Sequence, residues 1–201
     1  MTNTTPWDER YATEDYLYGT EPNDFLLSME EHLPVGMTLC VGEGEGRNAV
    51  WLAERGHRVT AVDASAVGLE KAKRLAKKRG VKIKTEVADI GNYFLEDNSY
   101  DLIVSIYAHA ARDARRKLHR TVVKALRPGG MFLLEAYTPK QLLYKTGGPP
   151  DVNKLMTLDD LREELHGLTF VHDMEIEREV IEGTLHTGRG AVVQVVAVKS
   201  N

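Results

Sequence analysis

The sequence predicts an α/β protein in which helices cover both faces of a doubly wound, mostly parallel sheet. A short apolar run at residues 38–41 meets a glycine-rich turn and then apolar positions at helical spacing, which is typical of a strand, a tight turn and a helix. Further apolar runs alternate with amphipathic segments as far as about residue 165. The last two apolar runs have no room between them for a crossover helix, so they should form an antiparallel hairpin.

Length and composition favour one globular domain, which we take to span residues 1–201, because 42% of its residues are hydrophobic. The net charge of −4 comes from interspersed charges, so we expect neither a nucleic-acid partner nor a membrane partner. The single cysteine, Cys40, excludes an intrachain disulfide framework and a cysteine-cluster metal site. A polar N-terminus without a long apolar run predicts a cytoplasmic protein. A monomer and a homodimer both stay open.

The first 35 residues are too aromatic to remain solvated. The aromatic residues in this segment are Trp7, Tyr11, Tyr16, Tyr18 and Phe25. A short helix is predicted at 7–11, and a second at 25–33, which Asn23 or Asp24 could cap before Pro34 ends it. The segment has two interpretations: a lid over the glycine-rich turn, or a helix that only covers the sheet.

The glycine-rich turn at residues 42–46 is the predicted ligand site. Glycines permit positive φ, and the N–H groups that open the next helix, which ends near residue 55, can bind a ligand. A dinucleotide site needs a small residue where Arg47 stands and no negative charge beside the pyrophosphate, yet Glu43 and Glu45 are acidic. A carboxylate suits a ligand with an ammonium and a sulfonium. The turn therefore favours S-adenosyl-L-methionine over NAD, with an ordinary glycine-rich turn as the alternative.

A second anchor is Asp63, which ends a predicted strand at 57–63. It lies seventeen residues after Gly46, close to the roughly 20-residue spacing at which nucleotide-binding folds place an acid on ribose hydroxyls. A strand-ending Asp can instead cap the following helix, but Ser65 is better placed to cap the one predicted at 66–79. We therefore favour the ribose role for Asp63.

Two further strand ends complete the predicted ligand edge of the sheet. A strand at 81–88 ends at Asp89 and Ile90, where a carboxylate and an apolar side chain could meet the amino group and ring face of adenine. A buried strand at 100–106 is followed by Tyr107 and His109. Ligands bind at this edge in open α/β sheets, so both side chains are candidates for the reaction site.

The rest of the chain continues the alternation. The predicted elements are a helix at 111–126, a turn at 127–130, a strand at 131–136, a loop at 137–151, a helix at 158–165 capped by Thr157, and strands at about 169–179 and 191–199. The long loop lies at the ligand edge of the sheet, so it is a candidate functional loop.

The chain resembles the class I S-adenosylmethionine-dependent methyltransferases over nearly its whole length. The matching pieces are the turn at 42–46, Asp63, Asp89, the Tyr100-Asp101 pair and residues 126–130. More narrowly, residues 7–11 with Tyr18-Gly19, and residues 43–48, look like the compact bacterial group of tellurite-resistance and thiopurine methyltransferases. The resemblance implies a Rossmann-like sheet of seven strands with an antiparallel last strand. Cys40 stands where many members carry an acidic residue, which leaves Glu43 as the partner for the methionyl ammonium.

The resemblance and the anchors above together define the expected cofactor site. The residues expected to bind S-adenosyl-L-methionine are Trp7, Tyr11, Tyr18, Gly42, Glu43, Gly44, Arg47, Asp63, Ala64, Ser65, Asp89, Ile90, Ser105 and Ile106. Ser105 and Ile106 should pass the methyl end of the cofactor. No metal ion is expected.

The methyl acceptor is the part of the reaction that the sequence constrains least. The acceptor pocket is expected to be bordered by Tyr107, His109, Tyr137, Tyr144 and His186, with His109 and Tyr107 as the candidate catalytic residues. For each histidine, a structural or exposed imidazole is the alternative. The resemblance implies a small soft acceptor: a thiol, sulfide or other chalcogen compound. The other hypotheses are a small hydroxylated or amine acceptor, and a protein that binds the cofactor without chemistry.

Overall fold

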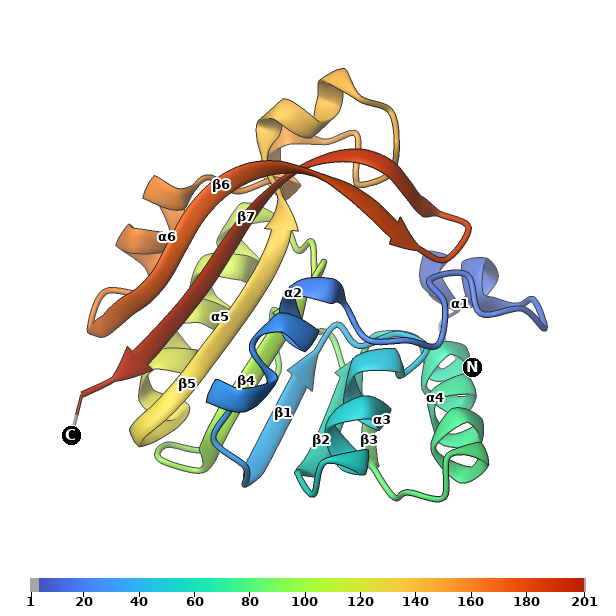
Figure 1. The fold of residues 1–201 in the computed structure, drawn as a ribbon, viewed down its shortest axis with the longest axis horizontal. Coiled ribbons are helices and arrows are strands. Elements are labelled where there is room, and N and C mark those ends of the chain that lie inside the picture. Colours follow the sequence, from blue (N-terminus) through green and yellow to red (C-terminus); the bar gives the residue numbers. More distant parts are fainter. Residues whose placement is uncertain (1–3, 201) are drawn as a thin grey trace.

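The computed structural model describes residues 4–200, which contain a seven-stranded sheet in the order β3-β2-β1-β4-β5-β7-β6 (Figure 1). The strands are β1 Met37–Val41, β2 Arg58–Asp63, β3 Lys84–Val87, β4 Tyr100–Ile106, β5 Leu126–Tyr137, β6 Leu168–Glu182 and β7 His186–Lys199. The first five strands pair in parallel, and β7 is antiparallel to both β5 and β6. The predicted sheet with an antiparallel last strand is confirmed.

The helices are α1 Pro6–Tyr11, α2 Asp24–Ser28, α3 Arg47–Glu54, α4 Ala66–Lys78, α5 Arg112–Ala125 and α6 Leu158–Glu164, with 3-10 turns η1 Glu30–His32, η2 Pro139–Leu143 and η3 Val152–Lys154. Helices α1, α2, α4 and α6 each begin at a capping side chain that accepts from an N–H group of the first turn. Asn23, Ser65 and Thr157 cap α2, α4 and α6 as the sequence predicts. The helix predicted at 25–33 is instead two pieces, because α2 ends at Ser28 and a 3-10 turn follows.

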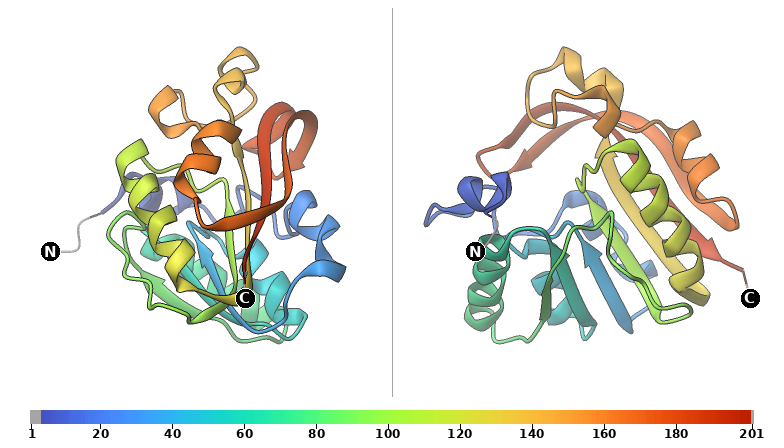
Figure 2. Two further views of the ribbon diagram at one scale, coloured as in Figure 1. Left: turned by 90° about the vertical axis from the view of Figure 1, so that its left-hand side faces the viewer. Right: turned by 180° about the vertical axis from the view of Figure 1, so that it is seen from behind.

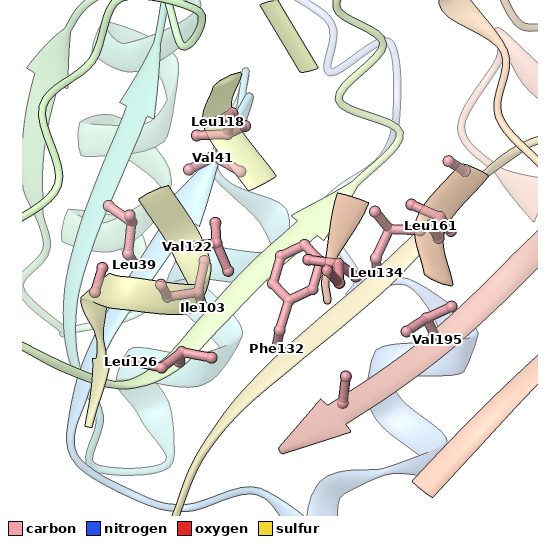
Figure 3. Packing of buried hydrophobic residues seen from close by; sticks show 14 of the residues in the cluster. Leu39, Val41, Ile103, Leu118, Val122, Leu126, Phe132, Leu134, Leu161 and Val195 are labelled. Atoms are coloured by element: carbon pink, nitrogen blue, oxygen red, sulfur yellow. The ribbon is translucent and has the colours of Figure 1, made fainter. Parts of the chain in front are cut away.

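Each face of the sheet has its own apolar core. Leu39 and Val41 of β1 lie in the cluster beneath α5 and α6 (Figure 3). Cys40, between them, belongs to the cluster on the opposite face, with residues of α2 and α3. This alternation follows from the two-residue period of a strand, and it confirms that Cys40 is a core residue. Figure 2 shows α5 and α6 on the rear face of the sheet.

The terminal hairpin is longer than the sequence predicts. Strands expected at 169–179 and 191–199 extend to Glu182 and back to His186, so the turn shrinks to residues 183–185. Gly188 and Gly190, which lie between the two predicted strands, are inside β7, where they pair with Val180 and Arg178 of β6. The extended part arches over the carboxyl ends of the parallel strands, and its tip approaches α1 (Figure 1). The hairpin therefore covers the edge of the sheet where the ligand site was predicted.

Two other strand boundaries differ from the predictions. The strand predicted at 81–88 is only Lys84–Val87, because β3 is an edge strand whose pairing with β2 spans four residues. The strand predicted at 131–136 begins earlier, at Leu126, where Leu126 pairs with Tyr100 before a register shift. Neither difference moves a carboxyl end of a strand away from the ligand edge.

Candidate functional site

A cavity of about 720 Å³ lies at the carboxyl ends of β1, β2 and β4. Its walls come from the N-terminal segment, the glycine-rich turn, the strand ends, the loop at 147–150 and the hairpin tip. The predicted residues that line it are Trp7, Tyr11, Tyr18, Gly42, Glu43, Arg47, Asp63, Ala64, Asp89, Ile90, Ile106, Tyr107, His109 and His186. Its size suits one nucleoside-sized ligand together with a small second molecule.

Three predicted cofactor residues, Gly44, Ser65 and Ser105, are absent from the cavity wall in the part of the chain that the structure describes. The hydroxyl of Ser65 accepts from Gly68 N and donates to Asp8, so it caps α4 and joins this helix to α1. Ser105 is buried and lies beside Val41 in the sheet, one position before the strand end. Its side chain therefore points to the face opposite that of Ile106.

The glycine-rich turn brings the backbone close to both the cavity and the N-terminal segment. Gly44 has φ +61°, and a Cβ built on it would lie 2.5 Å from the Tyr11 hydroxyl. Gly46, with φ +93°, opens α3. Any larger side chain at residue 44 would have to displace Tyr11. The turn and the N-terminal segment consequently form one packed wall of the cavity.

Glu43 is a buried carboxylate at the start of α3. Its Oε1 accepts from Asn48 N at 3.0 Å and from Ala49 N at 2.8 Å. Burial raises the pKa of Glu43 to about 7, despite these bonds and nearby Arg47. A cationic ligand in the cavity would offset this cost of burying the charge. The site therefore fits an ammonium or sulfonium compound, and the predicted cofactor carries both groups.

Glu45 has a different role from the one expected of it. The sequence interpretation has Glu45 repel a diphosphate, but the structure pairs it with buried Lys71, and its carboxylate also accepts from Tyr18 N at 3.2 Å. Its charge is therefore compensated within the protein. Glu43 and Arg47 are therefore the residues of the turn that disfavour a dinucleotide.

The carboxylate of Asp63 links the ends of β1 and β2 by accepting hydrogen bonds from backbone N–H groups. Its Oδ2 accepts from Gly44 N, and its Oδ1 accepts from Ser65 N, each at 2.8 Å. Burial raises the pKa of this carboxyl. Each carboxylate oxygen has a second lone pair, so the cavity-lining Asp63 can still accept from a ribose hydroxyl. Asp89 likewise lines the cavity while it accepts from Gly91 N and from the Asn92 amide.

Different parts of the N-terminal segment fit the two predicted roles, a lid over the glycine-rich turn and a cover for the sheet. Phe25 and Leu26 of α2 are buried in the core on one face of the sheet. The rings of Trp7 and Tyr11 stack at 5.8 Å, and both line the cavity with Tyr18. Helix α2 therefore covers the sheet, while α1 and the residues that follow it lie where a lid would lie.

Aromatic rings from three parts of the chain meet at the far end of the cavity, beyond Ile106: the segment after β4, the end of β5 and the start of β7. Tyr107 has φ +52°, and its hydroxyl donates to Glu135 at 2.7 Å. Its ring lies 4.7 Å from Tyr137 and 4.6 Å from His186. His109 stacks on Tyr137 at 5.6 Å. The four side chains meet as predicted and form an aromatic slot, although buried Tyr137 is not among the described residues that line the cavity.

Tyr144 does not join this group, although the sequence interpretation placed it there. The guanidinium of Arg189 lies 5.7 Å from the centre of its ring, and Tyr144 is absent from the cavity wall formed by residues 4–200. The 3-10 turn η2 carries Tyr144 away from the cavity, so the loop at 147–150 provides the wall instead.

The sequence interpretation missed a buried polar cluster beneath the hairpin. Arg178 of β6 donates to Glu135 at 2.6 Å and to Glu182 at 2.7 Å. Glu182 also pairs with Arg47 at 2.5 Å, and Asn23 donates to both carboxylates at 2.8 Å. A charged residue at 135 inside an otherwise apolar strand was the available signal. The cluster ties the hairpin to α2, α3 and β5.

The comparisons with known proteins agree with this geometry. Residues 38–130 match a family described as a methyltransferase domain. A methyltransferase of 2-heptyl-1-hydroxyquinolin-4(1H)-one from Mycobacteroides abscessus is 28% identical over 145 residues, which cover 71% of this chain and 61% of that protein. A tRNA 5-carboxymethoxyuridine methyltransferase from Escherichia coli is 34% identical over 52% of this chain and 41% of that protein. The chain thus spans less than two thirds of the length of either relative.

Two solved structures share the fold. One, from work on the conversion of a disulfide bond into a thioacetal group during echinomycin biosynthesis, has a TM-score of 0.77 at 20% identity and covers 96% of this chain and 88% of its own. TehB from Haemophilus influenzae has a TM-score of 0.69 at 20% identity, covering 96% of this chain and 66% of its own. At this identity the two structures show a shared fold alone, and the similarity of residues 38–130 to a methyltransferase domain supports S-adenosyl-L-methionine as the cofactor.

Among residues 4–200, no helix is long and apolar enough to cross a bilayer, and no cluster of three metal-ligating side chains occurs.

Proposed function

We propose that the protein is a methyltransferase that moves the methyl group of S-adenosylmethionine to a small soft nucleophile, a thiol or another organic chalcogen compound. The observation that supports this proposal is the continuity of the cavity, which runs from the buried carboxylates at the glycine-rich turn to the aromatic slot. The cofactor supplies a methyl group already activated on a sulfonium. The protein needs only to align the two molecules and exclude water.

Each end of the cavity has a distinct task in this proposal. Glu43 faces the methionyl ammonium, Asp63 the ribose and Asp89 the adenine, while Trp7, Tyr11 and Tyr18 close over the cofactor. Tyr107 and His109 border the acceptor beyond Ile106. A thiol suits the acceptor end because polarisable sulfur packs well against aromatic rings.

Cofactor binding is the first test of the proposal. S-adenosylhomocysteine should raise the melting temperature, whereas NAD should not. At a hundredfold excess over its dissociation constant, it should add about 2.7 kcal/mol to the free energy of unfolding. Equal shifts with the two ligands would contradict the cofactor assignment. Because Asp63 also holds the turn, Asp63→Ala must be compared with the wild type in both the free and the bound state.

Acceptor choice is the second test. Turnover of labelled cofactor should be measured with methanethiol, aromatic thiols, selenite, tellurite, phenols, amines and bulk tRNA. We expect the highest turnover with organic thiols. Turnover confined to phenols would favour the second candidate, a small hydroxylated acceptor, which the Mycobacteroides abscessus relative suggests. Turnover with tRNA alone would contradict the small-molecule proposal.

A further inference from the structure

The imidazole of His109 is held in one tautomer by a backbone carbonyl. Its Nδ1 lies 3.0 Å from the carbonyl oxygen of Lys154, in the 3-10 turn η3. A carbonyl oxygen only accepts hydrogen bonds, so Nδ1 must carry the proton. Nε2 of the neutral ring is then an acceptor with a free lone pair.

This lone pair has no partner among residues 4–200. His109 Nε2 is buried and makes no hydrogen bond there, although the side chain belongs to the cavity wall. Burial lowers the pKa of His109 to about 4, so the ring is neutral near pH 7. An unsatisfied buried acceptor is costly, and a ligand that donates a hydrogen bond would recover that cost.

The surroundings of Nε2 restrict the shape of such a ligand. The His109 ring is stacked on Tyr137 with 9° between the planes. The rings of Tyr107 and His186 lie edge to face with each other. Burial also lowers the pKa of His186, to about 3, so this second imidazole is neutral as well. Ring faces beside two neutral imidazoles favour a flat aromatic molecule at this end of the cavity.

We infer that the methyl acceptor is a neutral planar aromatic compound whose S–H or O–H group donates a hydrogen bond to His109 Nε2. The inference rests on the proposed function and narrows its acceptor to the aromatic members of the thiol and hydroxyl classes. It also gives Lys154 a positioning role, through its carbonyl group, in a segment far from β4 in the sequence.

The same contact accounts for the proton that the transfer releases. As the bond from the acceptor atom to the methyl carbon forms, the methyl–sulfur bond breaks and its electron pair stays on the cofactor sulfur. His109 Nε2 takes the acceptor's proton, so an imidazolium charge replaces the lost sulfonium charge. The net charge of the site is unchanged, which favours protonation of this weakly basic ring at that moment only.

Two measurements on the full wild-type chain test the hydrogen bond without turnover. Nitrogen NMR of the imidazoles should show Nδ1 protonated and Nε2 unprotonated in His109, with the Nε2 signal moving when naphthol binds. Naphthol should also bind about tenfold more tightly than methoxynaphthalene, which has the same rings and no donor. A protonated Nε2, or equal affinity for the two probes, would overturn the inference.

The variant His109→Phe keeps a ring on Tyr137 and removes the lone pair. Naphthol turnover should fall by about 10²-fold or more. Turnover of thiophenol, which is largely ionised in mildly alkaline buffer, should fall at least tenfold less than that. Equal losses with the two acceptors, while S-adenosylhomocysteine binding persists, would overturn the role of Nε2.

Failure of the proposed function would look different. If the wild-type protein does not bind S-adenosylhomocysteine, the methyltransferase proposal is contradicted. The NMR and naphthol measurements still test the hydrogen bond to His109 Nε2.

Discussion

The two ends of the cavity are built in different ways. At the cofactor end, the glycine-rich turn and the end of β2 supply two carboxylates, Glu43 and Asp63, which accept hydrogen bonds from backbone N–H groups of the turn, of α3 and of Ser65. At the acceptor end, side chains that follow β4 meet side chains of β5 and β7 and a backbone carbonyl of η3 beneath the arching hairpin. The cofactor end is thus local and acidic, and the acceptor end is assembled from distant parts and neutral. Substitutions in the aromatic slot could therefore change which acceptor binds while the glycine-rich turn continues to bind the same cofactor.

The largest expected effect comes from breaking the polar cluster that holds the hairpin over the acceptor end. Arg178→Met leaves Glu135 and Glu182 buried without their shared cation, so it should cost about 3–5 kcal/mol of unfolding free energy. Urea unfolding measures the loss. The matched control is Arg162→Met, because Arg162 pairs with Asp173 at the same 2.6 Å on the surface. That change should cost less than about 1 kcal/mol, and similar losses in the two variants would contradict the importance of the cluster.

The next effect concerns the cofactor end alone. Gly44→Ala places a Cβ 2.5 Å from the Tyr11 hydroxyl and strains a residue with φ +61°. Affinity for S-adenosylhomocysteine, measured by calorimetry, should fall about 100-fold, or about 2.7 kcal/mol. Gly80→Ala is the control, since Gly80 has φ +74° with nothing within 4 Å of the added Cβ. It should lower stability by about 1–2 kcal/mol without changing affinity. Unchanged affinity in Gly44→Ala would mean that the turn does not hold the cofactor.

The two ends should also respond oppositely to pH. Burial raises the pKa of Glu43 from 4.5 to about 7, so its contribution to stability is present below about pH 4.5 and is lost as the pH rises through 7. Burial lowers the pKa of His109 from 6.5 to about 4, so its contribution is present above pH 6.5 and is lost as the pH falls through 4. Relative to the wild type, Glu43→Gln should gain stability with rising pH and His109→Phe should lose it.

Urea unfolding of the two variants from pH 4 to pH 7.5 measures these slopes, each expected to be on the order of 1 kcal/mol per pH unit. Slopes of the same sign would contradict the contrast between an acidic and a neutral end.

The smallest expected effect concerns the lid. Trp7 is 41% exposed and stacks on Tyr11, so Trp7→Ala should weaken cofactor binding about three- to tenfold while stability changes by less than about 0.5 kcal/mol. Phe94→Ala is a suitable control, because Phe94 is 83% exposed and outside the residues that line the cavity. A loss of stability as large as the loss of affinity would favour plain packing of α1 over a lid.

The sequence by itself determined the elements whose signals are local. Alternating apolar runs, glycines at the turn and capping side chains at Asn23, Ser65 and Thr157 act through neighbours in the chain, so the mostly parallel sheet and its cofactor edge could be predicted. Most of the predicted cofactor residues line one cavity for the same reason: the carboxyl ends of parallel strands lie along one edge.

Only the tertiary structure decided the acceptor end. At the base of the hairpin, Arg178 and Glu182 of β6 meet Glu135 of β5 on the far side of β7, and pairing at such separation leaves no periodic pattern in the sequence. The same holds for the partner of Glu45, the exclusion of Tyr144 and the carbonyl that sets the tautomer of His109. A side chain's type can be read from the sequence, but its hydrogen-bond partner and its protonation depend on which distant groups the fold brings within about 3 Å of it.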